Sequence, residues 1–476
     1  MKKILPLILF VVSYTTLSQS ITLDTSYGVN GYTLFDSKTT DHLTYSKILN
    51  DGSILVSSSR YNTINAQQEL LLIKYNSSGN IDTSFGTNGE YIISHSDDNG
   101  VEIILDTNEN IYLFANVFEA KMFKLTPNGS LDINFGSNGV LTLFDNTTSF
   151  TPDYAAIVDG GIIIGASYVL NSTEKTTLKK IDFNGNFLTS FGTNGIVDFD
   201  FNLYEIKAPE SNGFFVSGGY NDSSFTIIKF DSNGTKDITF ATNGELTDND
   251  RSTIEYFRMY KIDNNYYTNI FYETSTSSEV SKYDLNGNLD TSFGNNGRLS
   301  FVSSLITDIH LYNNNLYITG FNIPDFNGSV YSFDLNGSVN SVFSNNGVYN
   351  IPSNNYKDLP LNLHIENNNL VITGSQRYSN TDVKHYSSKY NISSATASNQ
   401  EIENFNITFK NPIEDEVEVF SKNAQITKLT IFSLDGKHIK TSNSNKIKTE
   451  NLSQNLYILN CHLENGNIVS KKIIKQ

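Results

Sequence analysis

The chain has 476 residues, 17% of them charged, and a formal net charge of −17. This length is enough for a large core and a second domain. The acidic balance disfavours nucleic acid and anionic membranes as partners, because phosphate contacts need clustered Lys and Arg. Cys461 is the only cysteine, so the chain has no internal disulfide, and we interpret this residue as a small buried hydrophobic side chain.

The first predicted element is a secretory signal over residues 1–18. Two lysines at its start are followed by the apolar stretch 4–12, and residues 16–18 offer a small-x-small cleavage site. The apolar stretch is too short to span a bilayer as an ordinary helix. We therefore predict export to the periplasm and a mature protein that starts near Gln19.

A nine-residue tract then recurs seven times. Every copy keeps an aromatic residue at its fifth position and Asn-Gly at its end, and the aromatics are 49 to 58 residues apart. This period suits propeller blades better than helical repeats. The copies are LDTSYGVNG (23–31), IDTSFGTNG (81–89), LDINFGSNG (131–139), FLTSFGTNG (187–195), KDITFATNG (236–244), LDTSFGNNG (289–297) and VNSVFSNNG (339–347).

Two other elements recur between the copies. A Lys-aromatic turn element such as KYDLNGN (282–288) precedes most copies, and a polar turn followed by a β-rich run such as NLYITGF (315–321) lies between copies. These patterns predict about four short strands per repeat. The sequence shows no helical periodicity.

The ends of the repeat array are complementary. The first copy has no turn element before it, and the last turn element, KYNISSA (389–395), has no copy after it. A closed ring can join the two ends in one blade, which protects sheet edges. We therefore predict an all-β fold with a seven-bladed β-propeller over residues 19–397, in which Tyr32 to Phe35 supply the outer strand of the last blade.

Within the tract, the aromatic residue is predicted to fill the space between neighbouring blades. The residue after it is usually Gly, which allows a backbone angle that Ala241 and Ser344 tolerate less well. The Asp residues at the second position predict Asx-type turns, and Asn-Gly starts the outer strand. The predicted structural residues are Tyr27, Phe85, Phe135, Phe191, Phe240, Phe293 and Phe343.

The pattern changes after Ala397. Residues 398–404 read as a linker, and 405–476 alternate apolar and polar positions, which predicts a small antiparallel β-sandwich with hairpin turns at Asp435-Gly436 and Asn465-Gly466. Residues 401–476 carry ten Lys against nine Asp and Glu. The propeller therefore holds nearly all of the negative charge.

The carboxy-terminal segment resembles the type A sorting domain of the bacterial type IX secretion system. The matching residues are Asn411, Pro412, Asp435, Gly436, Lys437, Tyr457, Lys471 and Lys472, whereas Asn455 stands where the family usually has Gly. The resemblance implies that 405–476 engages the secretion machinery and is normally cleaved after translocation, leaving the protein free or attached to the outer surface. The repeat tract resembles the delta-60 repeat family, which implies no settled activity.

Catalytic spacings are absent from the sequence: it has no Gly-x-Ser-x-Gly, His-Glu-x-x-His, Cys-x-x-Cys or phosphate loop. The histidines lie scattered along the chain, at His42, His95, His310, His364, His385, His438 and His462. We predict no catalytic residues, no cofactor and no metal. Calcium remains an alternative at residues 106–110 and at the Asp-x-Asn-Gly turns 182–185, 231–234, 284–287 and 334–337, although the turns use the same oxygen atoms.

These features favour a non-enzymatic, monomeric, secreted or surface binding protein, with a glycan or surface protein as partner. A glycan-binding adhesin is one alternative, since the chain has 27 Tyr. A secreted hydrolase or lyase acting on polysaccharide or peptide at the channel mouth is another. Clustered carboxylates or His with shifted pKa values at that mouth favour the enzyme, and a flat polar rim favours binding.

Overall fold

The structure is a computed structural model, and it divides the chain into two compact units, residues 1–395 and 396–476. The signal segment, the linker 398–404 and both predicted hairpin turns of the second unit lie outside the residues it describes. The described residues are 19–36, 45–62, 66–94, 103–116, 120–143, 151–170, 173–210, 212–219, 224–248, 254–352, 357–379, 382–393, 407–421, 424–433, 437–464 and 468–476.

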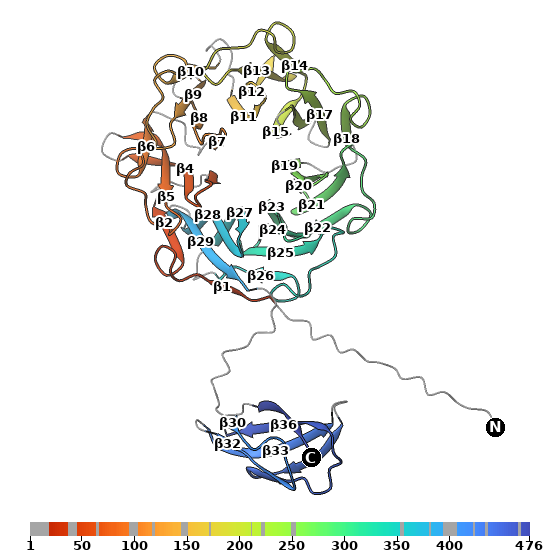
Figure 1. Cartoon of the computed structure of the whole chain (residues 1–476). Helices are drawn as coiled ribbons and strands as arrows, with labels where there is room; N and C mark the ends of the chain where they lie inside the picture. The colour runs from red at the N-terminus through yellow and green to blue at the C-terminus, as the bar shows by residue number, and fades with distance from the viewer. Residues whose placement is uncertain are drawn as a thin grey trace, which may run out of the picture. The chain divides into compact units, whose positions relative to one another are not determined.

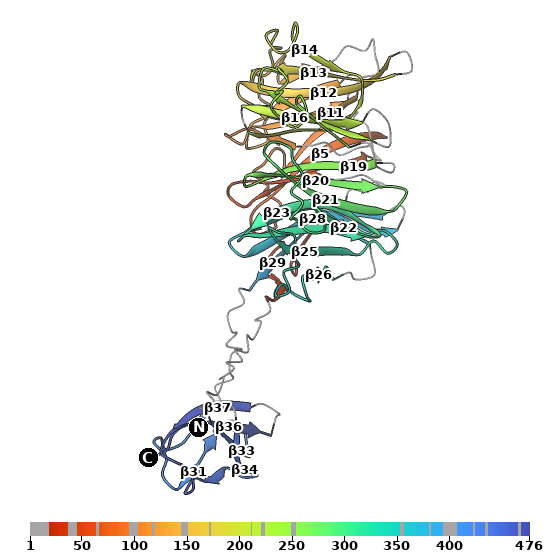
Figure 2. The same ribbon diagram turned by 90° about the vertical axis from the view of Figure 1, so that its right-hand side faces the viewer.

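The first unit is a β-propeller. Its described residues form six sheets of four antiparallel strands and one sheet of five. The sheets are arranged around a central axis, and the first strand of each four-stranded sheet lies nearest the axis (Figure 1). Figure 2 shows the same ring from the side. The all-β propeller prediction is confirmed.

The six four-stranded sheets follow one another along the chain, and each runs from an inner strand outward. They are β3 (Tyr45–Ile48), β4 (Ile54–Asn62), β5 (Gln67–Tyr75) and β6 (Glu90–Ser94); β7 (Ile103–Leu105), β8 (Ile111–Asn116), β9 (Ala120–Leu125) and β10 (Val140–Thr142); β11 (Thr151–Val158), β12 (Gly161–Leu170), β13 (Thr173–Ile181) and β14 (Ile196–Phe199); β15 (Asn202–Glu210), β16 (Gly213–Gly219), β17 (Phe225–Asp231) and β18 (Glu245–Asp248); β19 (Ile254–Ile262), β20 (Asn265–Tyr272), β21 (Ser277–Asp284) and β22 (Arg298–Phe301); β23 (Ser304–Tyr312), β24 (Asn315–Asn322), β25 (Gly328–Asp334) and β26 (Val348–Asn350).

The amino terminus closes the ring. Strands β1 (Ile21–Leu23) and β2 (Tyr32–Asp36) pair antiparallel with β29 (Asp382–Ile392), which follows β27 (Lys357–Glu366) and β28 (Asn369–Ser379) in the last sheet. Tyr32 lies opposite Ser388. The predicted closure by the segment after the first copy is therefore confirmed.

Gln19 adds a contact that the sequence did not indicate. In the other blades the N–H after the aromatic residue binds a carbonyl of the next turn element, as Gly86 N does with Asn128 O at 2.8 Å. At the seventh copy, Ser344 N instead donates to Gln19 O at 3.0 Å, and Gln19 N donates to Val342 O at 2.6 Å. Gln19 thus takes the place of a turn element.

The Asp residues of the tract hold two contacts each. In the copies at Asp24, Asp82, Asp132, Asp237 and Asp290, the carboxylate accepts the N–H two residues later, as the Asx-turn prediction requires. The same carboxylates lie 3.0 to 3.9 Å from the Lys of the turn element. In the fourth copy Leu188 replaces Asp, and Lys180 instead donates to the carbonyl oxygens of Asp159 and Ser232.

The residue after the aromatic lies in the left-handed region in every copy. Gly occupies it five times, with φ of 53° to 55°, but Ala241 and Ser344 adopt φ of 44° and 43°. A side chain in this region costs about 1–2 kcal/mol. The ring geometry therefore holds these two residues in a conformation that only Gly adopts without strain.

The seven repeated aromatics are all buried, with at most 3% exposure. Phe135 shows their surroundings: it packs with Tyr112 of its own blade, at 5.9 Å between ring centres in an edge-on arrangement, and with Ala155 and Ile162 of the next blade. Each blade thus joins its neighbour through an apolar side chain.

We expect Phe135→Ala or Phe293→Ala to lower the free energy of unfolding by about 3–5 kcal/mol, because each removes a fully buried ring. The matched control is Ile133→Ala in the same tract, where the side chain is 69% exposed. The Ile133→Ala substitution should alter the free energy of unfolding by no more than about 0.5 kcal/mol. Chemical denaturation of the three variants measures the difference, and equal costs would show that the aromatic is not a packing residue.

A buried acid lies in the closing sheet. Asp358 on β27 is fully buried opposite Gln376 of β28. Burial raises the pKa of Asp358 to about 7, and the Gln376 side chain opposes this shift. The folded state therefore keeps the proton between its ordinary pKa and pH 7, so stability falls across this interval as the pH rises.

We expect Asp358→Asn to abolish that fall. The shift corresponds to about 4 kcal/mol at most, so the variant should be more stable than the parent by a few kcal/mol at pH 8 and nearly equal at pH 4. Melting temperatures from pH 4 to pH 8 test this. If the melting temperatures of the two proteins changed with pH in the same way, the buried Asp358 would not be the cause of the change.

The second unit holds a sheet in the order β34 (His438–Ser442), β33 (Ile426–Ser433), β36 (Leu456–Leu463) and β37 (Ile468–Ile474). Two-stranded sheets pair β30 (Ile407–Thr408) with β32 (Phe420–Ser421) and β31 (Glu416–Glu418) with β35 (Lys446–Lys448). The predicted alternation places apolar side chains in its core, which contains Val417, Val419, Leu429, Ile431, Tyr457, Leu459 and Ile473. Cys461 is fully buried among them, and burial raises the pKa of its thiol to about 11.

Candidate functional site

Five inner strands share an irregularity that points side chains toward the channel. Strand pairing shifts register once near the start of β11, β15, β19, β23 and β27. Such bulges bend a strand and redirect a side chain, and they are frequent beside functional sites. The residues directly after the shifts are 51 to 54 positions apart: Tyr154, Glu205, Tyr256, Asp308 and Asn362.

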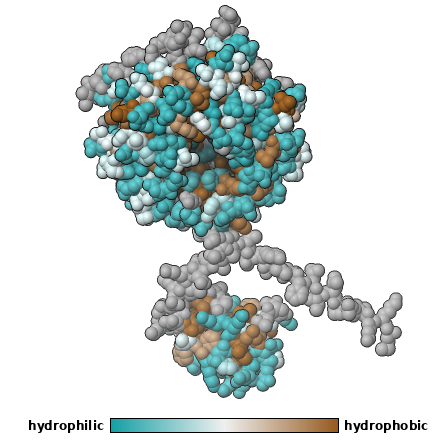
Figure 3. All heavy atoms as spheres, turned by 45° about the horizontal axis from the view of Figure 1, so that its top comes forward, coloured by the Kyte–Doolittle hydropathy of each residue, from teal (hydrophilic) through white to brown (hydrophobic). Residues whose placement is uncertain are grey.

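A cavity of about 620 Å³ lies between the inner strands, and all of these residues except Tyr154 line it. The propeller face is hollowed at its centre in Figure 3. The volume is in the range of small-molecule sites. The cations that line it are Lys47, Lys207 and Arg258, and the carboxylates are Glu205, Glu255 and Asp308. Its aromatic lining includes Tyr45, Tyr256, Tyr260 and Phe321.

Glu205 holds the next inner strand and faces two cations. Its side chain is 6% exposed, and Oε2 accepts the main-chain N–H of Met259 at 2.7 Å. Oε1 lies 3.7 Å from Lys207 Nζ and 3.9 Å from Arg258 Nε. The carboxylate is thus fixed on one side by the backbone and on the other by positive charge.

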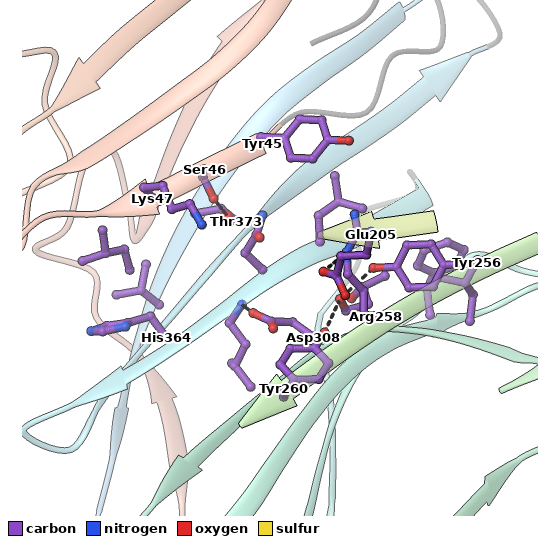
Figure 4. Close-up of a pocket in the computed structure, with 18 of the residues that line it drawn as sticks. Tyr45, Ser46, Lys47, Glu205, Tyr256, Arg258, Tyr260, Asp308, His364 and Thr373 are labelled. Carbon is purple, nitrogen blue, oxygen red and sulfur yellow. Dashed lines mark hydrogen bonds and ion pairs between the residues drawn. The ribbon is translucent and has the colours of Figure 1, made fainter. Parts of the chain in front are cut away.

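Arg258 is held by stacking. Its guanidinium lies 4.8 Å from the ring centre of Tyr256 and 6.0 Å from that of Tyr154, and Nη1 donates to the carbonyl of Phe257 at 3.3 Å. A guanidinium stacked on aromatic rings is attracted to their faces and keeps a planar set of donors in place. Figure 4 shows Arg258, Glu205 and Tyr256 together, with Lys47 and Tyr45 entering from β3.

Asp308 is bound by the backbone through both oxygen atoms. Oδ1 accepts the N–H of Ile309 at 2.9 Å, and Oδ2 accepts the N–H of Leu363 on β27 at 2.8 Å. Burial raises the pKa of this carboxyl, and the two main-chain bonds oppose the shift. Asp308 therefore repeats, between another two blades, the contact that Glu205 makes with Met259.

Two tyrosines complete this wall. The hydroxyls of Tyr256 and Tyr260 donate to the carbonyl of Thr307 at 3.1 and 3.3 Å. Burial raises the pKa of both hydroxyls above the ordinary value. They are therefore neutral donors at physiological pH.

The structure brings two histidines together that lie far apart in the sequence. His310 on β23 and His364 on β27 have ring centres 5.3 Å apart, because these strands are neighbours around the axis. Burial, followed by the effect of His364, lowers the pKa of His310. Among the described residues no group of three or more His, Cys, Asp or Glu is placed to hold a metal ion.

The suggested calcium ligands serve turns. Asp106 Oδ1 accepts the N–H of Asn108 and of Asn110, both at 2.9 Å, and Asp182 makes the same pair of bonds in its own turn. These oxygen atoms stabilise the backbone whether or not an ion binds.

Two parts of the chain match known families. Residues 49–85 match the domain of unknown function (DUF5122) β-propeller family, and residues 408–476 match the secretion system C-terminal sorting domain. The chain is a β-propeller protein with a C-terminal type IX sorting domain. Such a domain implies interaction with the type IX machinery and a secreted or outer-surface location. In the described part of the chain we find no helix with the length and apolarity that crossing a membrane requires.

Solved structures with similar propellers are distant. A prolyl endopeptidase is 10% identical, with 90% of this chain and 55% of that chain covered and a TM-score of 0.42. The β-propeller domain of the trilobed protease from Pyrococcus furiosus is 8% identical, with 77% of this chain and 98% of that chain covered and a TM-score of 0.43. The NanB sialidase from Streptococcus pneumoniae is 11% identical, with 76% of this chain and 70% of that chain covered and a TM-score of 0.39.

The chain spans 55% to 60% of the length of the peptidases it matches first. At these similarities the neighbours bear on neither the ligand nor the activity of this propeller. No curated protein is significantly similar in sequence.

The predicted sorting residues all belong to the sorting domain, residues 408–476. Asn411 bridges its edge, since Nδ2 donates to Lys472 O at 3.1 Å and Oδ1 accepts Ile474 N at 2.9 Å. Tyr457 is buried, whereas Lys437, Lys471 and Lys472 are exposed. Pro412 follows Asn411 directly, and Asp435 and Gly436 fall outside the described residues.

Sequence reasoning missed the cavity. Its residues sit in short polar interruptions of the inner strands, such as YEIK (204–207), EYFRMY (255–260) and TDIH (307–310), which recur at the blade period. That recurrence is the signal that could have identified them. The repeated aromatics, which the sequence made most visible, line no part of this cavity.

Proposed function

We propose that this propeller protein is a secreted or surface-held binding protein that takes its ligand in the channel cavity without transforming it. The observation that supports this is that two carboxylates on inner strands are bound to the backbone of the neighbouring blade. Glu205 and Asp308 each accept a main-chain N–H of the next inner strand. They are parts of a fixed wall, and a pre-organised wall suits recognition because little must be ordered on binding.

The proposed route to its place of action has two steps. Residues 1–18 direct the chain to the periplasm, and 405–476 then direct translocation by the type IX system. The propeller acts as a monomer on a glycan or surface protein, with no cofactor.

A hydrolase or lyase is the second candidate. The channel offers more than a flat polar rim, because three carboxylates line its cavity. Burial raises the pKa of Asp308, whereas Glu205 lies beside two cations. Unequal environments of two carboxyl groups are the arrangement that separates an acid from a base.

The test uses residues 19–476 and a variant with a filled channel, Asn362→Trp. The matched control is Asn295→Trp, at the variable seventh position of an exposed tract where the first copy has Val29. Glycan arrays and pull-downs should find a ligand that the parent and the control retain and Asn362→Trp loses. A ligand bound equally by all three overturns the channel site. A ligand recovered in cleaved form after incubation favours the enzyme.

A further inference from the structure

The charges in the channel cavity are balanced. Three cations and three carboxylates line it, and they come from inner strands on different sides of the axis. This balance contrasts with the net charge of −17 for the whole chain. An anionic ligand would meet Glu205 and Asp308, and a cationic ligand would meet the stacked Arg258. Charge complementarity therefore disfavours an ionic ligand.

An apolar ligand is also disfavoured. It would cover Arg258, Lys207 and Glu205 without replacing the hydrogen bonds that water gives them, and this desolvation costs free energy. The ligand must therefore offer both donors and acceptors. A hydroxyl group does so, because it donates one hydrogen bond and accepts two.

The wall leaves polar capacity for such a ligand. Arg258 has five N–H donors: Nη1 donates to Phe257 O, Nε lies beside Glu205, and the guanidinium also forms a hydrogen bond with the Tyr154 side chain. Stacking on Tyr256 holds the remaining donors in one plane. Tyr45 enters the same cavity from β3, and Phe321 adds an apolar surface from β24. Charged donors beside aromatic rings match a ligand with hydroxyl edges and C–H faces.

We propose that the cavity binds a neutral saccharide, the uncharged terminal unit of a glycan. This inference rests on the proposed function and names its ligand class. The volume of about 620 Å³ is that of a site for a small molecule, so it accepts the end of a chain. The saccharide places hydroxyls against Arg258, Lys207 and Glu205 and a C–H face against the aromatic side chains.

The test compares sugars that differ only in charge. Glucose, galactose and mannose are each titrated calorimetrically into residues 19–476, together with the matching uronic acid and amino sugar. At least one neutral sugar should bind, with both charged analogues about tenfold weaker or more. Its affinity should hardly change between low and high salt, since screening acts on charged ligands.

Two variants locate the site. Arg258→Lys keeps the charge but removes the planar donors, and should weaken the neutral sugar about tenfold. Asn362→Trp should abolish binding, and Asn295→Trp should leave it unchanged. Circular dichroism melting of each variant shows whether it is folded.

The outcomes separate the two proposals. Preference for a uronic acid or an amino sugar overturns the neutral saccharide and leaves a channel-binding protein standing. Channel-dependent capture of a peptide or protein, with no sugar bound, does the same. If no ligand of any class depends on Asn362, the proposed function itself fails.

Discussion

Deleting residues 19–36 should destabilise the whole propeller, by well over about 5 kcal/mol, which is comparable to the entire stability of many domains. The deletion removes β1 and β2 from the last sheet and exposes β29 as an unpaired edge. It also removes Tyr27, a buried aromatic whose hydroxyl lies 2.8 Å from Ser387 Oγ. Loss of that ring alone costs about 3–5 kcal/mol.

The measurement is thermal unfolding of residues 37–476 beside residues 19–476. Adding a synthetic peptide of residues 19–36 should restore the melting temperature, because the peptide can pair with β29 again. A peptide of the same composition in scrambled order is the matched control. A truncated protein that melts like the parent would show that the amino terminus does not close the ring.

Removing residues 405–476 should abolish export across the outer membrane while leaving the propeller folded. The contacts of the chain divide at residue 395, and the sorting domain has a core of its own. Separate cores are typical of independently folding units. We expect the truncated protein to accumulate in the periplasm, and a periplasmic reporter fused to 405–476 to travel outward in a host with the type IX system.

Cell fractionation with an antibody to the propeller measures both effects. A sharper variant is Leu459→Asp, which buries an unpaired charge in the core of the sorting domain and should stop export like the deletion. The exposed change Lys448→Gln should export normally. Normal export of the truncated form would refute the sorting role of this domain.

The repeat was readable from the sequence because it is local. Asn-Gly turns and Asx turns depend on neighbours within nine residues, so each copy shows similar residues in the same order. Ring closure was also readable, because the missing turn element at one end and the unmatched one at the other leave a single way to complete a sheet. The ion pair between Lys282 and Asp290 could also have been predicted, since both residues belong to recurring elements.

The cavity could not be predicted in the same way. Glu205, Arg258, Asp308 and His364 lie 50 or more residues from one another, on four different inner strands. Only closure of the ring brings them together, because the inner strand of each sheet then lies beside the central axis. The bulges then decide which side chains face inward, and a bulge depends on pairing with the second strand of the blade.

The repeated blade, its closure by the segment after the first copy and the carboxy-terminal sorting domain could all be predicted from the sequence, since these follow from local turn chemistry and from an extended family pattern. The tertiary structure alone decided the pairing of His310 with His364, the place of Gln19 beside the seventh copy and the fixed carboxylates of the channel wall. These contacts join residues that are 54 to 325 positions apart, and their energies depend on burial and on the orientation of neighbouring strands. Neither quantity is encoded in the spacing of residues along the chain.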